Sequence, residues 1–246
     1  MISLDVVIPV YNEETALPNS VQVLNKFLLD NFTGLEWRIL IADNGSTDST
    51  LDVAERLSRE YSRVDCMHIE QKGRGRALRS AWLQSHADIV SYMDVDLSTD
   101  LRTLPELIES IVDGGYDVSM GSRLARGAVV KGRSIKREVT SRGYVLLINI
   151  LFWTSFSDVQ CGFKALTRAT VDTLVPLVRD NAWFFDTELL LLALHHGFRV
   201  REVPVLWNDD RDSRVKVIST AMEDVKGLLR LRFGGIPELS NNLDSR

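Results

Sequence analysis

Short apolar runs alternate with amphipathic stretches through the first half of this chain. The runs are rich in β-branched residues, which is typical of strands buried inside a sheet. Between them, apolar residues recur at helical spacing, as in Leu17, Val21 and Leu24. Strands that alternate with helices predict an α/β fold with a mostly parallel sheet and right-handed crossovers. The predicted strands are 5–10, 37–42, 64–69, 89–93 and 117–120, and the helical stripes lie within 17–28, 51–61, 77–82 and 104–112.

The second half has a different pattern, and no Pro/Gly/Ser-rich linker separates it from the first. We therefore expect one domain over residues 1–235. Within it we expect a basic loop plus an apolar interfacial helix at 123–157, an amphipathic helix at 216–233 and, beyond it, a frayed tail at 236–246. The other predicted elements are a leucine-dense helix at 188–194 and a strand at 200–207, and the stripe of the last helix consists of Ile218, Met222, Val225, Leu229 and Phe233.

Composition narrows the functional classes. The chain has 246 residues and a formal net charge of −5, which argues against a general nucleic-acid binder. Cys66 and Cys161 lie far apart, which suits a reduced, cytoplasmic protein and provides no metal-ligand spacing. We expect no signal peptide, because the first apolar run reads as a strand. The apolar run at 144–153 is about half as long as a membrane span.

Two carboxylates, Asp94 and Asp96, flank one apolar residue at the end of a predicted strand. In an extended strand, residues i and i+2 point the same way, so these side chains project together. Two like charges so close resist joint ionisation, and a divalent cation that also binds phosphate oxygens removes that conflict. The pair therefore indicates a metal–diphosphate site. A turn or helix cap is the alternative, because 97–100 is a candidate helix start.

A second polar loop, 43–48, follows a buried strand and precedes a helix. Asp43 at the strand end is placed to accept a hydrogen bond from a base N–H group. The alternative is a turn in which Ser46, Thr47 or Asp48 caps the helix. The two interpretations are compatible if Asp48 caps the helix and Asp43 binds the base.

A glycine-rich basic turn, 72–76, opens the third predicted helix. It lacks the third glycine of a dinucleotide-binding loop and follows the third strand instead of the first, so we reject that function. An anion at the helix N-terminus and a solvated basic turn are both compatible with the sequence.

Basic residues gather in the stretch 123–142, which contains a single acid, Glu138. Arginine pairs bidentately with phosphate, and each basic residue near an anionic membrane gains about 1 kcal/mol. A solvated loop is the alternative. The adjacent apolar segment favours binding to a membrane surface, although a helix of the protein core has the same composition. The last predicted helix leaves the same two alternatives open. The basic residues are Arg123, Arg126, Lys131, Arg133, Lys136, Arg137 and Arg142, and those of the last helix are Lys226, Arg230 and Arg232.

Together these motifs resemble the family 2 glycosyltransferases, which have the GT-A fold. The resemblance rests on 7–14, 43–48, 94–96 and 121–123. Within that family the chain is similar to the polyprenyl-phosphate sugar synthases, and most similar to the dolichyl-phosphate β-glucosyltransferase branch. The segments that carry this closer likeness are 158–164, 183–190 and 202–207.

The resemblance implies roles for individual residues. Asp94 and Asp96, with Ser98 as a further ligand, would hold Mg²⁺ or Mn²⁺ on the diphosphate of the donor. Asp186 would contact the sugar or the metal, with helix capping as the alternative. The nucleoside would be bound by Pro9, Tyr11, Glu13 and Asp43, and the nucleotide also by Lys72 and Asp94. The acceptor phosphate would be bound by Arg123, Arg137 and Ser141.

The expected activity is inverting transfer of a hexose, with glucose favoured, from a nucleoside-diphosphate sugar to a polyprenyl phosphate. The alternatives are a GDP-mannose donor in place of UDP-glucose, a saccharide acceptor, or a sugar-nucleotide binder without catalysis. The histidines show no ligand spacing and receive no role.

The sequence departs from the family pattern in two ways. Asn44 stands where many relatives have a second acid, so the base contact depends on Asp43. Family members also often carry membrane spans. This chain shows none, so we expect it to bind the cytoplasmic face of a membrane peripherally, through amphipathic surfaces, a membrane-protein partner or both.

Overall fold

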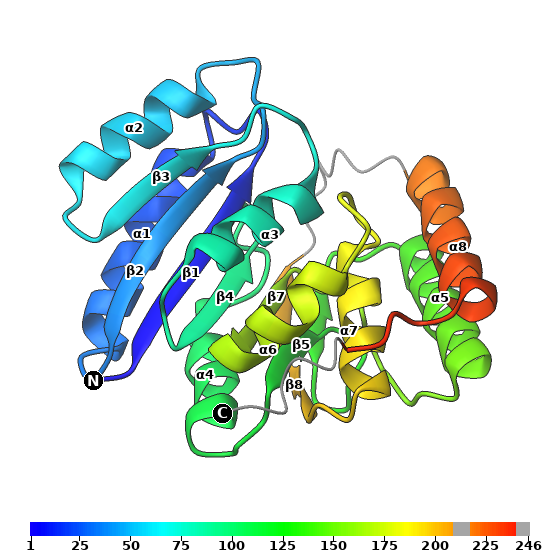
Figure 1. The fold of residues 1–246 in the computed structure, drawn as a ribbon. Helices are drawn as coiled ribbons and strands as arrows, with labels where there is room; N and C mark the ends of the chain where they lie inside the picture. The colour runs from blue at the N-terminus through cyan, green and yellow to red at the C-terminus, as the bar shows by residue number, and fades with distance from the viewer. Residues whose placement is uncertain (209–216, 240–246) are drawn as a thin grey trace.

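The computed structural model describes residues 1–208 and 217–239, and its centre is a seven-stranded sheet in the order β3-β2-β1-β4-β7-β5-β8 (Figure 1). All neighbouring strands are parallel except β7, which runs antiparallel to both β4 and β5. The prediction of a mostly parallel α/β sheet is therefore confirmed. The strands are β1 (Ser3–Val10), β2 (Glu36–Asp43), β3 (Val64–His68), β4 (Ile89–Met93), β5 (Val118–Ser122), β6 (Val129–Lys131), β7 (Phe163–Thr167), β8 (Val200–Pro204) and β9 (Leu206–Asn208).

Helices cover both faces of the sheet, because alternate side chains of its strands are apolar and buried on both sides. One core lies under α1, α2 and α4, and the other under α3, α6 and α7. The helices are α1 (Leu17–Asn31), α2 (Thr50–Glu60), α3 (Arg74–Gln84), α4 (Leu104–Val112), α5 (Ile135–Phe152), α6 (Arg168–Leu174), α7 (Phe185–His195) and α8 (Val217–Gly234), with 3-10 turns at Leu101–Thr103 and Val175–Leu177.

The sequence pattern did not predict β7, which places residues 163–167 between the two halves of the sheet. Its Lys164 is fully buried, and a charged residue inside a five-residue run hides the strand pattern. The antiparallel register pairs Met93 with Phe163, so the segment that precedes β7 lies beside the end of β4. This placement brings two predicted motifs together.

The single strand predicted at 200–207 is wrong, because the structure divides it into β8 and β9. Pro204 has no N–H group to continue the ladder, and the chain changes partners there. β8 pairs with β5, whereas β9 pairs with β6 in a separate two-stranded sheet. The predicted leucine-dense helix at 188–194 forms the later part of α7, which begins at Phe185.

The basic stretch is also more ordered than predicted. α5 begins at Ile135, inside the stretch, where the Ser134 hydroxyl accepts a hydrogen bond from the Arg137 N–H group. It ends where Trp153 adopts a left-handed conformation with φ 51°. The predicted 216–233 helix is α8, which packs beside α5 at one end of the molecule (Figure 1). None of the described helices is long and apolar enough to cross a bilayer.

Two parts of the predicted C-terminal helix and tail lie outside the described residues. These are the side chain of Ile218 in the stripe and residues 240–246 of the predicted tail.

The contact between α3 and α7 makes a prediction about stability. A Cβ atom at Gly75 would lie 2.6 Å from the Cβ atom of Phe185, so Gly75→Ala must separate two packed helices. We expect a loss of about 1–3 kcal/mol of unfolding free energy, measured by denaturant titration. Gly143→Ala, on α5, is the matched control, because no atom lies within 4 Å of its new methyl group. Equal stability of the two variants would contradict this packing.

Candidate functional site

The three predicted metal ligands meet at the end of β4. Asp94, Asp96 and Ser98 line one hollow of about 10 Å³, together with Met93, Leu97 and Thr99. The Asp96 carboxylate accepts a hydrogen bond of 2.9 Å from the Ser98 N–H group. Leu97 between them has a φ of 49°, a conformation that costs energy in a residue with a Cβ atom. The chain therefore turns sharply here, and the turn brings the three residues to one hollow.

The segment before β7 holds Asp94 in position. The Asp94 N–H group donates to the Gly162 carbonyl at 3.2 Å. A Cβ atom at residue 162 would lie 1.8 Å from Asp94 Oδ2, so only glycine leaves room for the carboxylate. This contact explains the glycine of the 158–164 motif in physical terms.

A buried cluster of charges lies behind Asp94. Arg74, the first residue of α3, donates to Asp94 Oδ1 at 2.9 Å and also to Asp186. Asp186 accepts from the Tyr92 hydroxyl and lies 3.1 Å from the Lys164 ammonium group. Burial alone would raise the pKa of Asp186, but Lys164 and Arg74 outweigh it and hold that pKa below its ordinary value. Arg74 and Lys164 therefore neutralise the buried Asp186, and Arg74 also bonds the partly exposed Asp94.

The structure thus places Asp186 behind Asp94, with both carboxylate oxygens already bonded within the protein. The sequence pattern did not mark Arg74 or Lys164 as parts of the site. Arg74 lay in the glycine-rich turn, but nothing in its spacing showed that it is buried, with only 10% of its side chain exposed.

The glycine-rich turn does not form a backbone anion site. The Gly73 N–H group donates to the Asn44 side chain at 2.6 Å. The Gly75 and Arg76 N–H groups donate to the Ala182 and Asn181 carbonyls. The protein itself uses these donors, so they are not available to bind an anion at the N-terminus of α3. The interpretation of this turn as an anion site is therefore wrong. Asn44 has a structural role in this arrangement.

The predicted nucleoside residues gather at the ends of β1, β2 and β3. Asp43 is fully buried, and its Oδ2 atom lies 2.6 Å from Nδ1 of His68 at the end of the neighbouring strand. Its Oδ1 atom has no hydrogen-bond partner within the described structure. Buried carboxylate oxygens are normally paired, so this oxygen is suited to an N–H donor from a ligand. Strand register places His68 beside Asp43, a relation that sequence spacing does not reveal.

The other members of this group lie close by. The Lys72 ammonium group sits 3.5 Å from the centroid of the Tyr11 ring. Asn12 has a φ of 57°, and the N–H group of Glu13 donates to Thr50 at 2.7 Å. Pro9 precedes them in β1. Asp48 accepts a hydrogen bond from the N–H group of Thr50, the first residue of α2, although Ser49 occupies the N-cap position and makes no side-chain cap bond.

The predicted acceptor residues share one aromatic side chain. The guanidinium carbons of Arg123 and Arg137 lie 5.5 and 5.9 Å from the centroid of the Trp207 ring. Arg123 also forms a bidentate pair with the buried Asp158, at 2.7 and 3.0 Å. Burial opposes ionisation of Asp158, yet Arg123 lowers its pKa to about 2. Ser141 lies one turn beyond Arg137 on α5 and accepts a hydrogen bond from Arg133.

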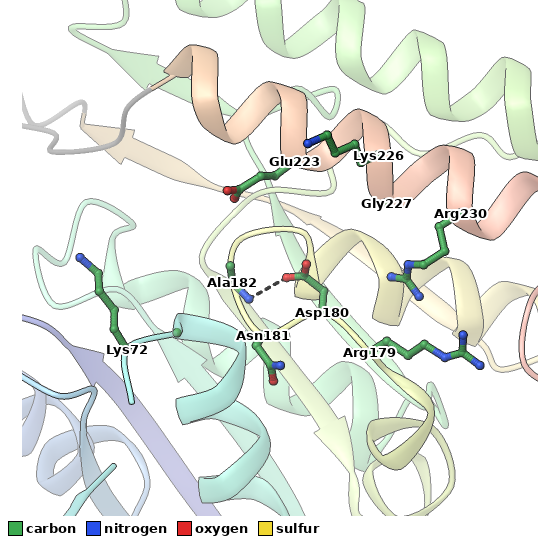
Figure 2. A pocket seen from close by; sticks show the side chains of 10 residues that line it. Lys72, Arg179, Asp180, Asn181, Ala182, Glu223, Lys226, Gly227 and Arg230 are labelled. Carbon is green, nitrogen blue, oxygen red and sulfur yellow. Dashed lines mark hydrogen bonds between the residues drawn. The ribbon is translucent and has the colours of Figure 1, made fainter. Parts of the chain in front are cut away.

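A hollow of about 470 Å³ separates the start of α3 from α8 (Figure 2). Lys72 lies on the α3 side, and Glu223, Lys226 and Arg230 of α8 lie on the other. The loop 179–182 forms the floor between them. The hollow therefore adjoins the predicted nucleotide residues and has α8 as one wall.

The apolar stripes of α5 and α8 face outward. Val145 and Ile148 of α5 are buried, as are Leu228 and Leu231 of α8, and the core-helix interpretation holds for these positions. Tyr144, Leu151 and Phe152 of α5 are partly buried against the same core. The exposed apolar side chains are Ile135, Val139, Leu146, Leu147, Ile150 and Trp153 around α5, and Met222, Val225, Leu229 and Phe233 on α8. Exposed apolar side chains gathered on two neighbouring helices are typical of a site of interaction.

The buried Asp224 of α8 makes the site sensitive to pH. Burial, followed by the nearby carboxylates of Asp180, Glu223 and Asp186, raises the pKa of Asp224 to about 7. In the unfolded chain that pKa is about 4, so ionisation of Asp224 opposes folding increasingly as the pH rises from about 4 to about 7. We expect Asp224→Asn to raise the melting temperature more at about pH 8 than at about pH 5. Glu109→Gln, which removes an exposed carboxylate of α4, is the control. An equal gain for Asp224→Asn at both pH values would contradict this environment.

Comparison with known proteins shows the family to which this chain belongs. The family model "Glycosyl transferase family 2" matches residues 5–174. Glycosyltransferase AglD of Haloferax volcanii is 38% identical over 88% of this chain, which spans only 35% of the length of AglD. The dolichyl-phosphate beta-glucosyltransferase of Saccharomyces cerevisiae is 28% identical, with 94% of this chain and 75% of that protein covered.

A solved structure shares the fold. The glucosyl-3-phosphoglycerate synthase of Mycobacterium tuberculosis, in complex with Mn²⁺, UDP-glucose and phosphoglyceric acid, superposes with a TM-score of 0.71 at 20% identity. The match covers 96% of this chain and 81% of that one, and it confirms the GT-A type of fold. By the family model and by its fold, the chain belongs to glycosyl transferase family 2.

Proposed function

We propose that this chain is a metal-dependent hexosyltransferase that transfers glucose from UDP-glucose to a polyprenyl phosphate, with inversion at the anomeric carbon. The proposal depends above all on the convergence of Asp94, Asp96 and Ser98 on one hollow at the sheet edge that also presents Asp43. Relatives named dolichyl-phosphate beta-glucosyltransferase support the sugar and the lipid acceptor. The similar structure that holds Mn²⁺ and UDP-glucose makes this donor the first to test.

A divalent cation, Mg²⁺ or Mn²⁺, fits the donor atoms of the hollow. Hard cations prefer carboxylate and hydroxyl oxygens, which Asp94, Asp96 and Ser98 offer together. The Asp94 side chain is 44% exposed, so its carboxylate is accessible despite the bond to Arg74. When bound, the cation would offset the charge that develops on the leaving diphosphate.

The nucleoside would lie over the ends of β1 and β2. Asp43 Oδ1 would accept the base N–H, and the Tyr11 ring with Lys72 would contact the base or ribose. Pro9 and Glu13 would shape the edge of this pocket. Discrimination would depend on Asp43, because a buried acceptor rejects a base that cannot donate to it.

The acceptor needs no general base. A phosphate monoester is already anionic near neutral pH, so its oxygen can attack the anomeric carbon directly. Arg123 and Arg137 would orient it, with Ser141 as a hydrogen-bond partner. The new carbon–oxygen bond forms as the bond to the nucleoside diphosphate breaks, and the leaving group retains the electron pair. Asp186 would act as a positioning residue through Arg74.

The outward apolar surface of α5 and α8 would lie on the cytoplasmic face of a membrane, next to the acceptor residues. Lys136, Arg142 and Arg232 are exposed on the same helices and would contact anionic headgroups. Residues 1–235 would then function as one peripheral catalytic domain. The start of the predicted tail is not frayed, because Ile236 and Leu239 pack against the core and the Pro237 carbonyl lies 2.9 Å from Nε2 of His196. A membrane-protein partner that covers this surface is the alternative, and vesicle binding by the purified protein separates the two.

Gly162→Ala tests the geometry at Asp94. Its methyl group would occupy the space of the Asp94 carboxylate, so we expect transfer to fall by about 10²-fold while the protein remains folded. Steady-state kinetics and a thermal melt would measure the two effects. Gly34→Ala is the matched control, since no atom lies within 4 Å of its new methyl group. Full activity of Gly162→Ala would refute this placement of Asp94.

Sugar transfer itself is tested with purified protein, polyprenyl phosphate, Mn²⁺ and radiolabelled UDP-glucose. We expect label in the organic-extractable lipid, and loss of that label when EDTA removes the cation. Label from GDP-mannose alone would support the same mechanism and identify GDP-mannose, in place of UDP-glucose, as the donor. Label in a soluble saccharide, or in no product, would reject the lipid acceptor.

A further inference from the structure

α8 has two faces with different surroundings. Its outward face exposes Met222, Leu229 and Phe233, of which Phe233 is 80% exposed. Its inward face buries Asp224 and Leu228 against the site. A surface helix that only stabilised the core would bury its apolar stripe, whereas here most of the stripe points away from the protein.

The inward face of α8 bonds to two segments of the site. Asp224 accepts a hydrogen bond of 2.9 Å from the side chain of Gln160, two residues before the glycine that packs on Asp94. Arg230 forms a bidentate pair with the fully buried Glu188 of α7, at 3.0 and 2.8 Å. One helix therefore connects to the segment that packs on Asp94 and to α7, which carries Asp186.

The backbone of α8 also approaches the start of α7 very closely. A Cβ atom at Gly227 would lie 2.3 Å from the Phe184 ring. Phe184 immediately precedes α7, whose second residue is Asp186. A small movement of α8 at this contact must therefore move the start of α7 or the ring between them.

The inward face has one unsatisfied group. Asp224 is only 2% exposed, and its Oδ1 atom has no hydrogen-bond partner among the described residues. Buried carboxylate oxygens are normally paired, so the burial of Asp224 between α8 and the site is not optimised for stability alone. α8 also forms one wall of the hollow that faces Lys72 (Figure 2).

From these contacts we infer that α8 couples lipid binding to donor binding, with Asp224, Gly227 and Arg230 as positioning residues. The inference rests on the proposed function, since it assigns a lipid bilayer to the outward face and UDP-glucose to the site. Exposed cations on the same helix, Lys226 and Arg232, favour an anionic bilayer as the occupant. A bilayer that fixes α8 would fix Gln160 and the start of α7, and so would increase affinity for the donor. Coupling of this kind is reciprocal.

Calorimetry with Mn²⁺ and UDP-glucose, with and without vesicles of anionic phospholipid, measures this coupling. We expect vesicles to tighten donor binding about fivefold or more, and donor to tighten vesicle binding by the same factor. Gly227→Ala should remove the coupling because its methyl group forces α8 away from Phe184. Asp224→Ala should reduce it, and Phe233→Ser should remove the response to vesicles. Gly34→Ala is the control and should keep the wild-type coupling.

The outcomes separate this inference from the proposed function. Wild-type protein that binds both donor and vesicles without mutual effect would overturn the coupling and leave the transferase assignment intact. Wild-type protein that binds no UDP-glucose would overturn both. If Gly227→Ala and Asp224→Ala fail to fold, reciprocity in the wild-type protein remains decisive, because the two coupling factors must be equal and greater than one.

Discussion

The arrangement at the sheet edge depends on the charges of Arg74, Asp186 and Lys164, which lie behind the partly exposed Asp94. Each carboxylate lies next to a cation, and Arg74 bridges the two acids. Buried ion pairs of this type gain little net stability, because desolvation offsets the attraction, but removal of one partner leaves a costly unpaired charge. The cluster is therefore best understood as a device that fixes the position of Asp94.

The topology of the sheet makes this cluster possible. The antiparallel strand β7 inserts Lys164 beneath the end of β4, and Gly162 allows the chain to pass directly against Asp94. α3 contributes Arg74 from one side and α7 contributes Asp186 from the other. Elements that are far apart in the sequence thus meet around one carboxylate, and a change in any of them displaces it.

The repeating strand–helix pattern was enough to predict the fold class, since both hydrophobic periodicities are strong in the first half. It was also enough to place the strand-end loops that carry Asp43, Asp94 and Asp96. It missed β7, because the buried Lys164 breaks the apolar run and is explained only by a tertiary partner. It missed His68 for a similar reason, since strand register and not spacing brings it to Asp43. Long-range pairing of charges leaves no periodic signal in a sequence.

The central claim is that Asp94 and Asp96 hold a divalent cation on the diphosphate of a nucleotide sugar. Mn²⁺ binding followed by electron paramagnetic resonance, with and without UDP, tests it most directly in wild-type protein and in the Asp96→Asn variant. We expect UDP to strengthen Mn²⁺ binding in the wild type, and Asp96→Asn to lose this effect while it keeps its melting temperature. Equal Mn²⁺ binding by the two proteins in the presence of UDP would contradict it.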